Sequence, residues 1–235
     1  MLGGYRKRHM KLELIREKSR DFPKIENPLD FTEIKIWHCR YQSLNKISDF
    51  QNAENIEIAT YPDASLEFIG KLSKVKSLKI IHLPRVNDIS PLSKLESLET
   101  LYLAILPSWD KLQHIASLNP LSRLRNLHSL SLHGIFVDDG SLQPLHSCPL
   151  LNEFHSGNLF SMQELLNLKA VKPEIKGTFF DPIVELPYSH CSKCGSLKVI
   201  MSGIIKYAIQ CPKCNNKRVE RHLREWQMYQ TKIAA

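Results

Sequence analysis

The sequence predicts an α/β solenoid, an arc of about six short parallel strands, followed by a small C-terminal metal-binding domain. A repeated apolar pattern in the middle of the chain predicts the arc, and two CxxC motifs near the end predict the metal-binding domain. The composition agrees, since 43% hydrophobic and 24% charged residues are typical of a globular protein with a buried core.

Apolar residues recur at relative positions 1, 4, 7 and 9, in copies that start at residues 31, 53, 75, 95, 124 and 148. The last two positions of each copy are two residues apart, which is typical of a strand, so we favour strands over independent helices. A unit of 20 to 29 residues cannot cover its own apolar face, so the copies must stack. The first three copies are Phe31-Ile34-Trp37-Cys39, Ala53-Ile56-Ala59-Tyr61 and Val75-Leu78-Ile81-Leu83. The last three are Leu95-Leu98-Leu101-Leu103, Leu124-Leu127-Leu130-Leu132 and Cys148-Leu151-Phe154-Ser156, of which the last copy lacks an apolar residue at its final position.

Segments such as LESLETLYL and LRNLHSLSL resemble the leucine-rich repeat family, over roughly residues 31–170. The resemblance implies one short parallel strand in each repeat and a return segment on the outer side. ISPLSKL (89–95), LNPLSRL (118–124) and LQPLHSC (142–148) are the candidates for these returns. The family often has an asparagine in the turn after each strand, where its side chain hydrogen bonds to the backbone of the turn. This chain has no asparagine at the equivalent positions, so the curvature of its arc does not follow from the resemblance. These positions hold Gln42, Ala64, Val86, Leu106, Ile135 and Leu159.

We expect four regions along the chain. Residues 1–30 form an N-terminal cap segment that shields the end of the stack, and residues 31–172 form the repeats. Three prolines between residues 173 and 187 indicate a linker. Residues 188–235 form a zinc ribbon with a C-terminal helix.

Four of the six cysteines have the spacing CxxC-x16-CxxC, which predicts a four-thiolate zinc site made of Cys191, Cys194, Cys211 and Cys214. Alternating apolar residues between the two pairs predict a hairpin, and two such cysteine turns joined by a hairpin resemble a zinc ribbon. Four thiolates fill the tetrahedron around Zn²⁺ and leave no position for water, so we expect a structural site. Cys39 and Cys148 lie at core positions of the repeats and are interpreted as small buried hydrophobic residues.

The residues between the repeated apolar positions are predicted to face the concave side of the arc, where a partner protein would bind. Isoleucines recur at one such position in the first three repeats, and either form an exposed apolar row or pack under the N-terminal segment or a loop. The candidate partner-binding residues are Ile36, His38, Arg40, Ile58, Thr60, Ile80, His82, Tyr102, His133 and His155.

The net charge of +8 is concentrated near the two ends of the chain. Residues 186–235 contain nine Lys/Arg and two Asp/Glu, whereas residues 31–185 contain 15 and 17. A basic C-terminal region gives an alternative function, nucleic-acid binding through the ribbon and the helix. Its candidate residues are Lys213, Lys217, Arg218, Arg221 and Arg224.

The sequence contains no Walker loop, GxGxxG, HExxH or GxSxG motif, so we predict a protein that binds macromolecules without catalysis. Compact proteins with irregular repeats of this kind resemble bacterial adaptors and immunity proteins, which implies a protein partner such as a toxin or effector. The early basic residues are not followed by an apolar block, and no apolar run is long enough to span a membrane. We therefore expect a cytoplasmic location.

Overall fold

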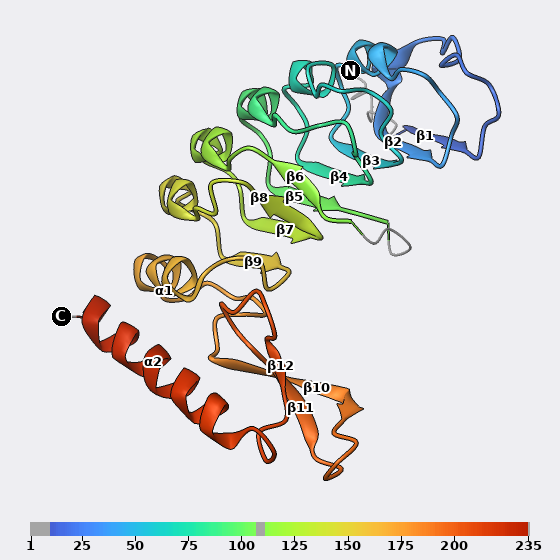
Figure 1. Ribbon diagram of the computed structural model, residues 1–235. Helices are drawn as coiled ribbons and strands as arrows, with labels where there is room; N and C mark the ends of the chain where they lie inside the picture. Colours follow the sequence, from blue (N-terminus) through green and yellow to red (C-terminus); the bar gives the residue numbers. More distant parts are fainter. Residues whose placement is uncertain (1–9, 107–110, 235) are drawn as a thin grey trace, which may run out of the picture.

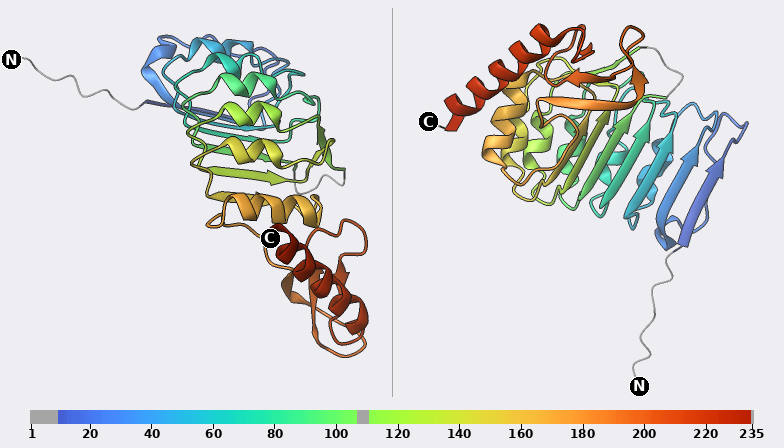
Figure 2. Two further views of the ribbon diagram at one scale, coloured as in Figure 1. Left: turned by 90° about the vertical axis from the view of Figure 1, so that its left-hand side faces the viewer. Right: turned by 90° about the horizontal axis from the view of Figure 1, so that it is seen from below.

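The computed structural model describes residues 10–106 and 111–234 (Figure 1). Its main body is a solenoid built on one seven-stranded parallel sheet with the strand order β1-β2-β3-β4-β5-β7-β9 (Figure 2). The strands are β1 Met10–Ile15, β2 Phe31–Trp37, β3 Asn55–Ala59, β4 Ser77–Ile81, β5 Thr100–Ala104, β7 Ser129–His133 and β9 Glu153–Ser156. Six of them are the repeat strands predicted from the sequence.

The seventh strand, β1, comes from the segment expected to be only a cap. It pairs in parallel with β2, and its side chains Leu12 and Leu14 pack against the edge of the core. Phe22 and Ile25, in the loop that follows, also pack against the core. The N-terminal segment thus shields the end of the stack and also extends its sheet.

The outer side of the arc carries a column of short 3-10 helices (Figure 1). All three predicted return segments form such helices, at Ser90–Lys94, Asn119–Arg123 and Gln143–Ser147. The others are Pro28–Asp30, Asn45–Asp49 and Ile69–Lys71. A two-stranded sheet of β6 (Gln113–Ile115) and β8 (Ile135–Val137) adds a local layer after β5 and β7.

The register of the sheet corrects the frame of the first three repeats. Leu78 lies beside Leu101, and Ile80 lies beside Leu103. The template for these copies therefore begins three residues earlier than the sequence analysis placed it, at residues 28, 50 and 72. The error arose because apolar residues recur every three positions, as in Leu72, Val75, Leu78 and Ile81, so two frames matched.

The core lies between the sheet and the column of 3-10 helices. The two inward positions of each strand from β2 onward are buried, for example Ile34 and Ile36 in β2 and Leu101 and Leu103 in β5. In the corrected frame, the turn position occupied by asparagine in the family holds Cys39, Tyr61 or Leu83 in the first three repeats, and all three are buried. The asparagine ladder is therefore absent in either frame.

The column of helices ends with α1 (Met162–Val171), and a three-stranded antiparallel sheet follows. Ser161 caps α1 by accepting a hydrogen bond from the amide of Glu164. The strands of the sheet are β10 Ile183–His190, β11 Leu197–Met201 and β12 Ile209–Gln210, and the chain ends in α2, Asn216–Ala234.

The segment 173–187, expected to be a linker, is packed structure. Ile175, Phe179 and Phe180 belong to the core of the solenoid, and β10 already begins at Ile183. The prolines suggested a linker because they interrupt helices, but they do not prevent a chain from packing as irregular structure or as an edge strand. The C-terminal domain consequently sits directly on the last repeat (Figure 1).

No helix in the part of the chain that the structure describes is long and apolar enough to cross a membrane.

Candidate metal centre and partner surface

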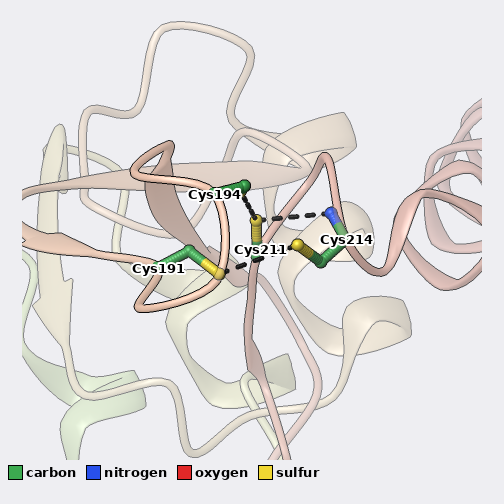
Figure 3. Close-up of side chains that lie close together, drawn as sticks. All are labelled: Cys191, Cys194, Cys211 and Cys214. Carbon is green, nitrogen blue, oxygen red and sulfur yellow. Dashed lines mark hydrogen bonds between the residues drawn. The ribbon is translucent and has the colours of Figure 1, made fainter.

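The four cysteines of the CxxC motifs converge on one point (Figure 3). Cys191 and Cys194 flank the turn before β11, while Cys211 and Cys214 flank the turn between β12 and α2. Their sulfurs all lie within 4.8 Å of one another, with Cys191 Sγ 3.8 Å from Cys214 Sγ and Cys194 Sγ 3.5 Å from Cys211 Sγ. A tetrahedral zinc–thiolate site has Zn–S bonds of about 2.3 Å and so places its sulfurs about 3.8 Å apart. The donor set therefore fits a metal ion.

Backbone amides favour the thiolate form in the first cysteine turn. The amides of Lys193 and Cys194 lower the pKa of Cys191, and hydrogen bonds from Ser196 lower the pKa of Cys194 to about 6. In the second turn, the amide of Cys214 donates to Cys211 Sγ at 3.4 Å. In the same turn, the neighbouring thiols of Cys194 and Cys191 raise the pKa of Cys214. Thiolates are the form that binds metal, so the first turn is the one whose backbone favours ligand binding.

The C-terminal domain has only a small core of its own. Val199 and Met201 of β11 pack against Val219 of α2. Trp226 of α2 packs instead against Met162 and Leu166 of α1, and so belongs to the contact with the solenoid. A segment with so few buried apolar residues depends on other constraints, and the cysteine cluster and the docking contact supply them.

The predicted row of exposed isoleucines is wrong. Ile36 is 1% exposed, and Ile58 and Ile80 are fully buried. They are the second inward residues of their strands and belong to the main core. This burial follows directly from the three-residue frame error.

Four other predicted partner residues lie just after the strands. His38, Thr60 and His82 have positive φ angles of 52°, 72° and 64° and follow β2, β3 and β4 directly. Their amides continue the parallel ladder by donating to the carbonyls of Ala59, Ile81 and Ala104. Arg40 is exposed in the following turn. These residues occupy the rim of the sheet.

Two of the residues at this rim are histidines, His38 after β2 and His82 after β4. His38 Nδ1 lies 3.1 Å from the hydroxyl of Thr60. His82 is 9% exposed, and its burial, together with the nearby His38, lowers its pKa below the usual 6.5.

The outward face of the sheet carries three lateral rows of side chains, defined by the register. The charged row contains Glu13, Lys35, Glu57, Lys79, Tyr102, Ser131 and His155. The apolar row beside it contains Ile15, Trp37, Ala59, Ile81, Ala104 and His133. The remaining row contains Lys11, Glu33, Asn55, Ser77, Thr100, Ser129 and Glu153. Tyr102, His133 and His155 are thus the predicted residues that the structure places on this face.

Trp37, which was predicted to be a core residue, lies partly exposed on the concave face in the apolar row, next to the charged row. The Nζ of Lys35 is 5.1 Å and that of Lys79 is 5.8 Å from the centroid of the Trp37 ring. Lys79 also lies 5.5 Å from the centroid of Tyr102, and the Tyr102 ring lies 5.3 Å from that of His133. A signal for Trp37 was available in the correct frame, which makes positions 34 and 36 the two inward positions and places Trp37 directly after them, on the outward face.

The five basic residues of the alternative function are all exposed, and lie at the second cysteine turn and in the first half of α2. The opposite side of α2 contains the buried residues Val219, His222 and Trp226. The predicted apolar face also included Leu223, which is 36% exposed, whereas His222 takes the buried place by hydrogen bonding to the carbonyl of Pro182 at 2.8 Å.

No protein-family model matches the chain, and no curated protein matches it. Among solved structures, an internalin C2 of Listeria monocytogenes superposes with a TM-score of 0.52 at 17% identity, covering 72% of this chain and 69% of that one. An internalin (inlF) of the same bacterium has a TM-score of 0.48 at 15% identity, covering 72% of this chain and 46% of that one. A leucine-rich repeat protein of Leptospira interrogans has a TM-score of 0.36 at 14% identity, covering 64% and 43%.

The likeness to internalin C2, together with the parallel sheet and the column of 3-10 helices, identifies the fold as a leucine-rich repeat solenoid. The C-terminal domain adds a four-cysteine cluster that resembles the site of a zinc ribbon. The chain spans less than half of the length of the inlF internalin.

Proposed function

We propose that the protein is a non-catalytic module that binds another protein on its concave face, with Trp37 at the centre of the contact. The observation that carries this proposal is a continuous cluster across the charged and apolar rows, in which each side chain lies within 6 Å of the next. It is formed by Trp37, Lys79, Tyr102 and His133. Tryptophan and tyrosine are enriched among the residues that dominate binding energy at protein interfaces. Rigid neighbouring strands hold these side chains in place before a partner arrives, which reduces the entropy lost on binding.

The charges on this face support a protein partner over a polyanion. The charged row alternates in sign from Glu13 to Lys79, and Glu57 forms ion pairs with both Lys79 at 2.7 Å and Lys35 at 3.8 Å. A face with neutralised lysines has no excess positive charge for phosphates. We propose a toxin or effector as the partner class, in an immunity or adaptor role.

Affinity capture with matched variants tests the proposal. The full chain is immobilised and exposed to extract of its own cells, and bound proteins are quantified by mass spectrometry. Trp37→Ala and Tyr102→Ala should each reduce a defined set of proteins about tenfold or more. Lys94→Ala, on the outer 3-10 helix, should retain that set because Lys94 lies on the opposite side of the sheet. Capture that is equal for Trp37→Ala and Lys94→Ala would show that the concave face does not bind the partner.

We further propose that the four cysteines hold a structural Zn²⁺. The sulfur–sulfur distances and the thiolate-favouring amides support this metal, because zinc is the common ion of closed four-cysteine sites. The ion would supply the constraint that the small core of the C-terminal domain lacks, and four thiolates would leave no position for a reacting water. This domain would then act as a folded end cap for the solenoid.

Nucleic-acid binding remains a second candidate because the basic face of α2 points away from its packed side. Among the described residues, Arg221 has an ion pair with Glu225 at 3.9 Å, while Lys217, Arg218 and Arg224 have no ion pair. Fluorescence anisotropy with single-stranded RNA and duplex DNA of random sequence tests it. The triple variant Lys217→Ala/Arg218→Ala/Arg224→Ala should weaken a salt-sensitive affinity if this function exists. Absence of binding by the wild-type chain at low salt would exclude it.

A further inference from the structure

The two ends of the main sheet differ in how they are closed. Beyond β9, the amide of Phe154 donates to the carbonyl of Lys176, and the amide of Lys176 donates to the carbonyl of Asn152, both at 2.8 Å. The C-terminal domain covers that end. At the other end, β1 is the outermost strand, and β2 is its only strand neighbour among the described residues (Figure 2).

The hydrogen bonding of β1 shows which of its backbone groups face outward. The amide of Arg16, the residue directly after β1, donates to the carbonyl of Trp37 in β2 at 2.8 Å. Backbone groups alternate between the two edges of a strand, so Leu12 and Leu14 also turn theirs towards β2. The amides and carbonyls of Lys11, Glu13 and Ile15 therefore point away from the sheet, and no described residue is recorded as their partner. This edge can accept another strand.

The charged side chains of β1 indicate which charged residues an additional strand would carry. Within the sheet, charged residues face opposite charges on the next strand, since Lys11 lies beside Glu33 and Glu13 beside Lys35. The pattern continues inward where Lys35 lies beside Glu57. At the open edge, Lys11 and Glu13 of β1 form an ion pair with each other at 2.7 Å, and no strand of the described residues lies on their other side. An added strand completes the pattern if it places a glutamate beside Lys11 and a lysine beside Glu13.

A second copy of β1 meets this requirement when it runs antiparallel. With the two-fold axis at Leu12, Lys11 of each copy lies opposite Glu13 of the other, and both residues have outward backbone groups. The two adjacent registers place Lys11 against Lys11, or Glu13 against Glu13, and lose the charge pairs. The chosen register also brings Leu12 against Leu12 and Met10 against Leu14 on the core side, where Leu12 and Leu14 are still partly exposed.

We propose that the protein forms a two-fold dimer through edge-to-edge pairing of β1, which joins the two seven-stranded sheets into one. Main-chain hydrogen bonds supply the attraction, as in other cases of strand addition, and the two symmetric Lys11–Glu13 pairs fix the register. The concave faces of the two copies then lie side by side in a single continuous surface.

Sedimentation equilibrium of the full chain in reducing buffer tests the dimer. We expect wild type to be dimeric, and Glu13→Pro to be monomeric because proline removes an outward amide without removing a hydrogen bond to β2. Glu13→Ala keeps that amide and should show an intermediate dissociation constant. A monomeric wild type at about 100 µM, a concentration at which even a weak complex with micromolar Kd is populated, would overturn the proposal. A dimer that Glu13→Pro leaves unchanged would also overturn it.

Charge exchange tests the register. Lys11→Glu and Glu13→Lys each place like charges opposite one another twice, and each should weaken the dimer about tenfold. The double exchange Lys11→Glu/Glu13→Lys restores the pairs between copies and should recover affinity relative to both single variants. Circular dichroism at each step checks that β1 remains folded. Failure of the double exchange to recover any affinity in a folded chain would contradict the antiparallel register about Leu12.

Discussion

Asn158 accepts a hydrogen bond from the backbone amide of Gly203 at 2.8 Å, which joins the last repeat to the C-terminal domain across 45 residues of chain. The side-chain amide of Asn158 also donates to the carbonyls of Met201 and Ile204, each at 2.9 Å. One side chain thus satisfies three backbone groups of the turn that follows β11. The two parts of the molecule are held by a specific polar contact as well as by apolar packing.

Asn158→Ala should loosen this junction, because it leaves three partly buried backbone groups without their partner. We expect a loss of about 1–3 kcal/mol in the free energy of unfolding. Hydrogen exchange of the amide of Gly203 should accelerate in the same variant. Asn158→Asp keeps the oxygen that accepts from Gly203 and loses both N–H donors. It should therefore accelerate hydrogen exchange at Gly203 less than Asn158→Ala does. Unchanged exchange at Gly203 in Asn158→Ala would show that the turn is held by other contacts.

Gly203 is also required for a steric reason. Its φ is +75°, and a Cβ added there would lie 2.4 Å from the backbone nitrogen of Met162 in α1. Gly203→Ala should therefore force the turn away from α1 and lower the thermal unfolding midpoint. Gly140→Ala is the matched control, because Gly140 has a similar φ of +63° but no atom within 4 Å of its added Cβ. Gly140→Ala should lose only the free energy that a left-handed backbone conformation costs an alanine, about 1 kcal/mol. Equal losses in both variants would exclude a role for the contact with α1.

The metal site can be examined through its effect on folding. We expect about one zinc per chain by elemental analysis of the purified protein. Removal of the metal by a chelator should unfold the C-terminal domain and leave the solenoid sheet intact, since the solenoid has a large core of its own. Cys194→Ser should reproduce this result, whereas Cys148→Ser changes a buried thiol far from the cluster and should retain the zinc. Full zinc content in Cys194→Ser would contradict the proposed ligand set.

The burial of Ile58 predicts that a charge introduced there destabilises the protein more than a charge introduced at Ile81. Ile58→Glu places a charge in a fully buried position and should destabilise the solenoid by about 4 kcal/mol or more. Ile81→Glu changes a partly exposed residue in the apolar row and should cost about 1 kcal/mol. Urea denaturation of both variants compares them. Similar stability of the two variants would mean that Ile58 is not in the core.

The difference between Ile58 and Ile81 also shows how far the sequence could predict this structure. The repeats and the cysteine cluster follow from spacing, because each depends on residues at fixed local intervals, and the resemblance to leucine-rich repeats implied the return segments. The frame of the first three repeats could not be decided in that way, since threefold spacing of apolar residues continued through the strand. Only the register between neighbouring strands, as between Ile80 and Leu103, separates the two frames. The concave surface was consequently misassigned in the half that contains Trp37.

Local sequence patterns also could not predict how the C-terminal domain packs on the solenoid, because the contacts join residues far apart in the sequence. Asn158 resembles any polar residue of a loop, and its partners lie more than 40 residues away. Pro182 suggested a linker, yet its carbonyl accepts a hydrogen bond from His222 in α2. Contacts of this kind depend on tertiary structure and have no periodic signal.

His82 should make stability depend on pH. Burial lowers its pKa in the folded chain below the unfolded value of 6.5, so the unfolded chain binds the proton more readily. The folded state is therefore favoured above pH 6.5 and loses stability as the pH falls below it, with a slope of up to about 1.4 kcal/mol per pH unit for one proton. Urea denaturation at pH 7.5 and 5.5 measures this loss. His82→Gln should reduce the difference between the two pH values, whereas His128→Gln, at an exposed position, should leave it unchanged. An equal pH dependence in wild type and His82→Gln would show that His82 is not responsible.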